Sequence, residues 1–79
     1  MAVDPPREEL LALLRSHGVR GEIREVSPRA ADEAIFVVSP EDAGAANDRD
    51  LAIALQRLLN RKVWVVPDQP IWHRQSEPL

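Results

Sequence analysis

Residues 49–67 read RDLAIALQRLLNRKVWVVP, and this stretch decides the fold. Its first half predicts an amphipathic helix, because leucine and alanine recur at the spacing of one helical face. Arg61 and Lys62 then suit the negative end of that helix. Residues 63–66 are apolar on both faces of an extended chain, and Pro67 ends the run. We therefore expect a helix from about residue 48 to 60 that leads into a buried strand. The residues on the helical face are Leu51, Ala54, Leu55, Leu58 and Leu59.

The chain before this stretch predicts one further helix and two strands. Asp4 and two prolines are typical of a helix start, and Gly18 of a helix end, so the first helix should span about residues 5–17. Residues 19–26 alternate apolar and charged side chains, which indicates a half-exposed strand. Residues 34–38 are apolar without alternation, which indicates a strand buried on both faces. A short turn, or a kinked continuation of the main helix, should occupy residues 40–47.

This order of elements predicts a small α/β (α+β) domain of the form α-β-β-α-β. The first two strands should pair antiparallel across a short loop, and the helical crossover should make the second and third strands parallel. The sheet is then three-stranded and mixed, in the order 1-2-3, with two helices on one face. We expect a single domain over residues 1–73 and a frayed tail over residues 74–79.

Composition limits the classes of function. At 79 residues the chain has room for one small core, and with no cysteine it has neither disulfides nor thiolate metal sites, which favours the cytoplasm. No apolar run is long enough to span a membrane. The net charge of −3 argues against nucleic-acid binding, although Arg20, Arg24, Arg61 and Lys62 leave it as a weaker alternative.

The sequence predicts no catalytic, cofactor-binding or metal-binding residues. The serines fall at helix ends, in a loop and in the tail, without the G-x-S-x-G turn of a serine hydrolase. His17 and His73 lie far apart, and His17 suits a helix end. The acidic run from Glu41 to Asp50 lacks the spacing of an EF-hand loop and suits helix caps instead. The glycines form no phosphate-binding motif.

One resemblance supplies an alternative. LLALLRSHGV, EAIFVV and LAIALQRLLNRKVWVV resemble, in that order, a minimal nucleotidyltransferase domain. That family carries a Gly-Ser motif, where this chain has Val26-Ser27-Pro28, and three metal-binding acids. Asp32 matches the first acid only loosely, and Ala34 and Trp64 stand at the other two positions. The resemblance therefore implies a degenerate nucleotidyltransferase-like or nucleotide-binding domain without the catalytic acids that two-metal chemistry requires.

The leading hypothesis is a non-enzymatic regulatory or protein-interaction domain. Two helices cover only one face of a sheet, yet two strands are apolar on both faces. An uncovered apolar patch of about 300–600 Å² would mark a binding surface. Its covering could be the segment around Trp72, a second copy in a homodimer, or another protein. The interface candidates are Phe36, Val38, Trp64, Val66, Ile71 and Trp72.

Overall fold

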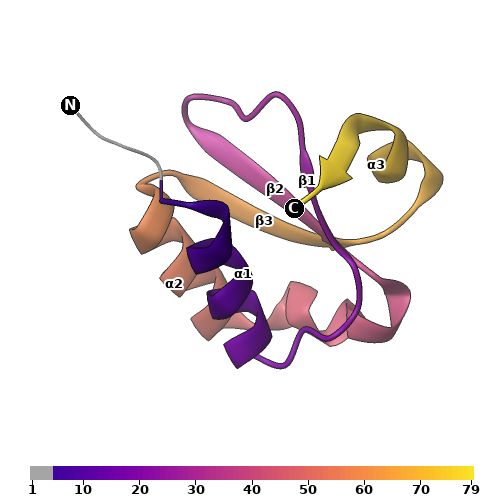
Figure 1. Ribbon diagram of the computed structural model, residues 1–79, viewed down its shortest axis with the longest axis horizontal. Coiled ribbons are helices and arrows are strands. Elements are labelled where there is room, and N and C mark those ends of the chain that lie inside the picture. The colour runs from indigo at the N-terminus through magenta and orange to yellow at the C-terminus, as the bar shows by residue number, and fades with distance from the viewer. Residues whose placement is uncertain (1–4) are drawn as a thin grey trace.

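The computed structural model describes residues 5–79 as a four-stranded sheet with helices on both sides (Figure 1). Helices α1 and α2 pack together on one side, and α3 lies on the other (Figure 1). The predicted cap Asp4 falls outside the described residues. None of the helices in residues 5–79 is long and apolar enough to cross a membrane. The elements are α1 (Arg7–Ser16), β1 (Ile23–Val26), β2 (Glu33–Val38), the 3₁₀ helix η1 (Pro40–Asn47), α2 (Arg49–Leu59), β3 (Lys62–Pro67), α3 (Pro70–Gln75) and β4 (Ser76–Pro78).

The sheet is mixed, in the order β3-β2-β1-β4. β1 pairs antiparallel with β2, and β2 pairs parallel with β3 because α2 carries the chain back across the sheet. The structure thus confirms a small mixed α/β domain, and its first three strands follow the expected order. The prediction of three strands is wrong, because β4 adds a fourth beside β1.

The C-terminal segment is paired, whereas the sequence predicted a frayed tail over residues 74–79. β4 runs antiparallel to β1, and the Leu79 amide donates to the Ile23 carbonyl at 2.9 Å. The Ser27 amide also donates to the Gln75 carbonyl at 2.9 Å. These bonds satisfy backbone groups along the edge of β1 that β2 does not reach. The tail is polar, so its pairing comes from the backbone and gives no apolar sequence signal.

The core lies between the sheet and the α1–α2 pair. Leucines one helical turn apart point inward from both helices and meet alternate side chains of the strands. This is the packing that the apolar face of residues 51–59 predicts. Phe36 and Val38, at the centre of the sheet, have no exposed surface. The core residues are Leu10, Leu14, Val19, Ile23, Ala34, Phe36, Val38, Leu51, Leu55, Leu59 and Val63.

The end of α1 confirms the role expected for Gly18. Gly18 has a φ of 90° and donates to the Arg15 carbonyl at 3.0 Å, while the Val19 amide donates to the Leu14 carbonyl at 3.2 Å. This pair of bonds is a Schellman motif, in which the left-handed residue is normally glycine. It turns the chain so that Val19 enters the core beside Leu14.

The acids before α2 bind backbone amides. Asp48, one of the acids expected to cap helices, caps α2 by accepting from the Leu51 amide at 3.1 Å. Asp42 instead accepts from the amides of Gly21 and Arg20, at 2.7 and 3.2 Å, and so joins η1 to the start of β1. A Cβ atom at Gly21 would collide with Ser39 Oγ and, at 2.9 Å, with Glu41 Oε1. It would also lie tightly against Asp42 Oδ2 at 3.0 Å. Glycine at position 21 therefore permits this junction.

We predict that Leu55→Ala lowers the free energy of unfolding by about 2–5 kcal/mol, because it leaves a cavity in a fully buried site. Such a loss is a large part of the stability of a small domain. Urea denaturation followed by circular dichroism measures it. The matched control is Ile53→Ala on the same helix, where the side chain is 38% exposed and the loss should be below about 1 kcal/mol. Equal losses in the two variants would contradict this core.

The hydrogen bond that caps α2 leads to a second prediction, which concerns how stability depends on pH. The hydrogen bond from the Leu51 backbone amide holds the pKa of the Asp48 carboxyl below its ordinary value of 3.8, and His17 makes a smaller contribution in the same direction. The folded state therefore binds the Asp48 proton less tightly, and the cap stabilises the protein above about pH 4 and loses this effect as the pH falls further. Asp48→Ala should lower the melting temperature at pH 7, and the difference from wild type should shrink below pH 4. Asp48→Ser, which keeps a capping oxygen, is the control.

Candidate interaction surface

The sheet face opposite α1 and α2 carries its own apolar cluster. The β2–β3 register pairs Ile35 with Trp64 and Val37 with Val66, so these four side chains share this face. Val37 is only 1% exposed, although it lies outside the core cluster beneath the helices. Trp64, on the edge strand β3, is 50% exposed. Coverage of this face is therefore uneven, and it is poorest at Trp64.

Helix α3 covers part of the face, so the first of the three expected coverings is present in part. Ile35, Trp64, Val66 and Trp72 line a pocket of about 220 Å³. Trp72 is half-buried, whereas its neighbour Ile71 is 58% exposed. The C-terminal segment thus brings one tryptophan to the pocket and leaves large apolar side chains open to solvent.

Two of the six interface candidates lie on the wrong face. Phe36 and Val38 point into the core beneath α1 and α2, where neither is exposed, and this chain offers neither of them to a partner. Since β2 is apolar on both faces, the sequence did not show which alternate set would face the helices. The register answers this, because Ile35 and not Phe36 is the neighbour of Trp64. The candidates Trp64, Val66, Ile71 and Trp72 remain on or near the open face.

An acidic and a basic side chain flank Trp64. Its indole Nε1 donates to Glu33 Oε2 at 3.2 Å, and Lys62 Nζ lies 5.9 Å from the ring centroid. The second distance allows a cation–π interaction. Glu33 and Lys62 are also register partners across β2 and β3. The exposed indole therefore lies between opposite charges, one of which accepts its hydrogen bond.

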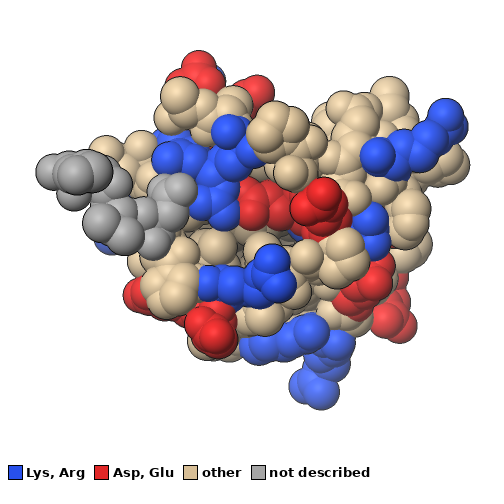
Figure 2. Space-filling view, turned by 45° about the horizontal axis from the view of Figure 1, so that its top comes forward, with Lys and Arg blue, Asp and Glu red and all other residues tan. Residues whose placement is uncertain are grey.

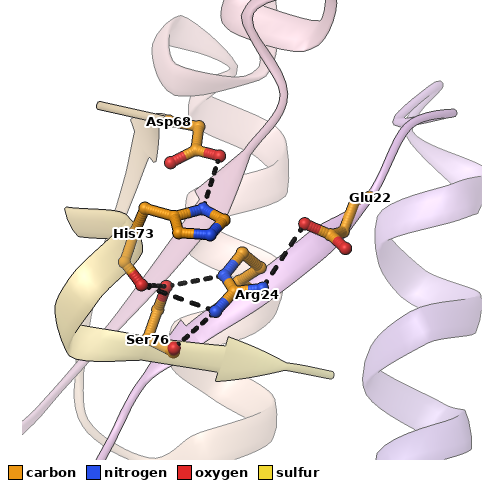
Figure 3. A network of polar contacts seen from close by, with 5 residues as sticks. All are labelled: Glu22, Arg24, Asp68, His73 and Ser76. Atoms are coloured by element: carbon orange, nitrogen blue, oxygen red, sulfur yellow. Dashed lines mark hydrogen bonds and ion pairs between the residues drawn. The ribbon is translucent and has the colours of Figure 1, made fainter. Parts of the chain in front are cut away.

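Arg24 ties the C-terminal segment to the sheet (Figure 3). It is the register neighbour of Val37 and so lies on the open face. Its Nε donates to Ser76 Oγ at 2.9 Å, and its Nη2 donates to the Ser76 carbonyl at 2.6 Å. A weaker ion pair joins Nη1 to Glu22 at 3.5 Å. Ser76 is buried, so one arginine fixes the junction between α3 and β4.

The same region brings together side chains that the sequence analysis did not connect. His73 Nδ1 lies 3.2 Å from Asp68 Oδ2, and ligand atoms of Glu22, Asp68 and His73 all lie within 4.8 Å of one another. Glu22 lies far from the other two in the sequence, and only the packing of α3 against β1 places it there. The close spacing of Asp68 and His73 around a turn was the one available signal.

The surface charge is mixed. In Figure 2, basic and acidic side chains lie next to one another across the visible face, without a continuous basic stripe. A phosphate backbone is usually held by basic residues gathered on one face. The distribution on this face therefore agrees with the net charge of −3 in giving no support to nucleic-acid binding.

We predict that Arg24→Met loosens the C-terminal segment specifically. Hydrogen bonds from a charged group contribute about 1.5–3 kcal/mol, so the Ser27 and Leu79 amides, which bond across this junction, should exchange with solvent about 10–100 times faster. Hydrogen exchange followed by NMR measures this. The Leu55 amide in α2 should keep its rate, and exposed Arg49 supplies the control Arg49→Met. Faster exchange of all amides alike would contradict a local role.

The positions suggested by the nucleotidyltransferase resemblance form no set of metal ligands. Asp32 is exposed before β2, Ala34 is buried in the core, and Trp64 is the exposed indole of β3. Neither alanine nor tryptophan has a carboxylate to hold a metal ion. No family model, curated protein or solved structure matches this chain.

Proposed function

We propose that this chain is a non-enzymatic interaction domain that self-associates through the sheet face around Trp64. The supporting observation is the half-exposed indole, which lines an apolar pocket with Ile35, Val66 and Trp72. Tryptophan that is held in place and poorly covered is a frequent anchor at protein interfaces. The cysteine-free sequence favours the cytoplasm as the place where the domain acts.

The charges around Trp64 favour a second copy as the partner. In a two-fold symmetric contact each subunit presents the same patch, so the patch must complement itself. Glu33 and Lys62 provide one charge of each sign beside the indole. A two-fold axis near Trp64 would place the lysine of each subunit close to the glutamate of the other. A patch of a single sign would repel its own copy.

Two serine hydroxyls and His17 have structural hydrogen-bond partners, which supports the non-enzymatic part of the proposal. Ser16 Oγ donates to the Leu13 carbonyl, and Ser76 Oγ donates to the His73 carbonyl rather than to its ring. His17 Nδ1 lies 3.3 Å from Asp48 Oδ2 at the start of α2. Nucleophilic catalysis would need a hydroxyl within reach of such a base.

The expected association is weak. Full burial of a large apolar side chain contributes about 1.5–3 kcal/mol. Trp64 and Ile71 are each about half exposed in the monomer, so only about half of this contribution remains for each side chain in a dimer. Two copies of both side chains would therefore contribute roughly 3–6 kcal/mol, and the upper part of this range corresponds to a Kd on the order of 100 µM. An association of this strength suits a regulatory contact that forms and breaks with concentration.

Sedimentation velocity between about 5 and 500 µM tests the proposal. We expect a monomer–dimer equilibrium that Trp64→Lys weakens at least tenfold, because the variant removes the anchor and adds a charge. Ile53→Lys is the matched control, since Ile53 is the exposed large apolar residue of α2 and should leave the Kd unchanged. Circular dichroism checks that both variants fold.

A wild-type protein that stays monomeric at 500 µM would overturn self-association. If acrylamide still quenched its tryptophan fluorescence, the open face would remain available to a different protein. If both indoles were protected in that monomer, the interaction surface itself would be wrong. An equal effect of Trp64→Lys and Ile53→Lys on the Kd would also place the contact elsewhere.

A further inference from the structure

We infer that Glu22, Asp68 and His73 form a binding site for one divalent transition-metal ion of the zinc class, separate from the surface around Trp64. The three residues contribute two carboxylates and one imidazole, which is a ligand set that suits zinc and related ions. They come from three segments: the approach to β1, the turn after β3, and α3. Figure 3 shows Asp68 and Glu22 on two sides of the His73 ring.

The distances fit a small ion. One ligand atom from each residue lies within 4.8 Å of the other two. Bonds of about 2.1 Å to zinc in tetrahedral geometry place ligand atoms about 3.4 Å apart, so the ligand atoms must move together by up to about 1.4 Å. The Glu22 and His73 side chains are 57% and 54% exposed, so there is space for this movement once the contacts of Glu22 with Arg24 and of His73 with Asp68 adjust. Water would complete the coordination.

The backbone beneath the site is well ordered by hydrogen bonds. The Asp68 amide donates to the Val38 carbonyl at 2.7 Å, and the His73 amide donates to the Gln69 carbonyl at 2.8 Å. The segment that carries both ligands is therefore fixed at the end of β3 and in the first turns of α3. A pocket of about 470 Å³ lies beside Asp68 and His73, although Glu22 does not line it.

The two oxygens of the Asp68 carboxylate lie in different surroundings. Its Oδ2 atom faces His73, while its Oδ1 atom is buried without a hydrogen-bond partner. A buried oxygen of an ionised carboxylate without a partner is costly, and such an atom calls for water or an ion nearby. In Figure 3 the Oδ1 atom lies on the side of the carboxylate away from His73, so a cation held among the three ligands would bind through Oδ2.

Arg24 limits the kind of ion. Its guanidinium lies 3.5 Å from Glu22 Oε1, so its positive charge opposes a cation nearby. Its contacts with Ser76 keep it on the β4 side of Glu22 (Figure 3). Calcium and magnesium depend on oxygen ligands and charge alone, whereas the imidazole nitrogen adds a bond that zinc-class ions favour. We therefore expect zinc to bind more tightly than magnesium.

His17 provides an internal control. Its Nδ1 atom lies 3.3 Å from Asp48 Oδ2, and the Nδ1 atom of His73 lies 3.2 Å from Asp68 Oδ2. The chain therefore carries two similar His–Asp pairs. Across residues 5–79, Glu22, Asp68 and His73 are the one set of three metal-ligating side chains that meets at these distances. Only the His73 pair has such a third partner. A metal ion should therefore distinguish the two histidines.

The test is titration of the full chain with zinc chloride alone, followed by calorimetry and by NMR of the histidine rings. We expect one equivalent to bind and to shift the ring signals of His73 but not those of His17. His73→Ala and Glu22→Gln should each weaken binding at least tenfold, while His17→Ala should leave it unchanged. At a hundredfold excess over the Kd, zinc should raise the melting temperature by about 10 °C or more.

Three outcomes would overturn the inference. One is no saturable binding at millimolar zinc, and another is an equal shift of both histidines. The third is unchanged affinity in His73→Ala or in Glu22→Gln. Because His73 is exposed, its alanine variant should remain folded, and circular dichroism verifies this. If that variant did not fold, Glu22→Gln would give the result, since it leaves the His73–Asp68 contact in place.

Discussion

Burial of the central strand β2 on both faces is the constraint on which the rest of the structure depends. Ala34, Phe36 and Val38 require a layer of helices, and the α1–α2 pair supplies it. Val37 on the opposite face also needs cover, and it is buried although α1 and α2 lie on the other side. The chain meets the second need with its C-terminal segment, which returns across the sheet to β1.

This second layer is held in a different way from the first. The α1–α2 layer packs through leucines, and its stability comes from apolar surface removed from water. The C-terminal layer is short, and apart from Trp72 in the apolar pocket it is attached through backbone pairing and the Arg24 contacts with Ser76. It leaves Trp64 and Ile71 half exposed. The open surface and the Glu22–Asp68–His73 cluster both result from this incomplete layer.

Local signals in the sequence predicted one half of the molecule well. The leucine spacing of residues 51–59, the Gly18 stop and the Asp48 cap each act over one or two helical turns, and each appears in the structure. The C-terminal segment, residues 70–79, was less predictable. The pairing of β4 depends on the free edge of β1, far away in the sequence, and the polar residues of β4 carry no apolar alternation. Likewise, an apolar strand does not show which face its helices will cover, which is why Phe36 was assigned to the open face.

The position of β4 has a consequence for how the protein folds during synthesis. β1 lies early in the sequence, but β4, its neighbour at the outer edge, is the last strand of the sheet to leave the ribosome. Until then the outer edge of β1 lacks its partner strand, and exposed strand edges can pair with other chains. Arg24 and the neighbouring Glu22 place charges along this edge. They would discourage such pairing in the nascent chain before Arg24 finds Ser76.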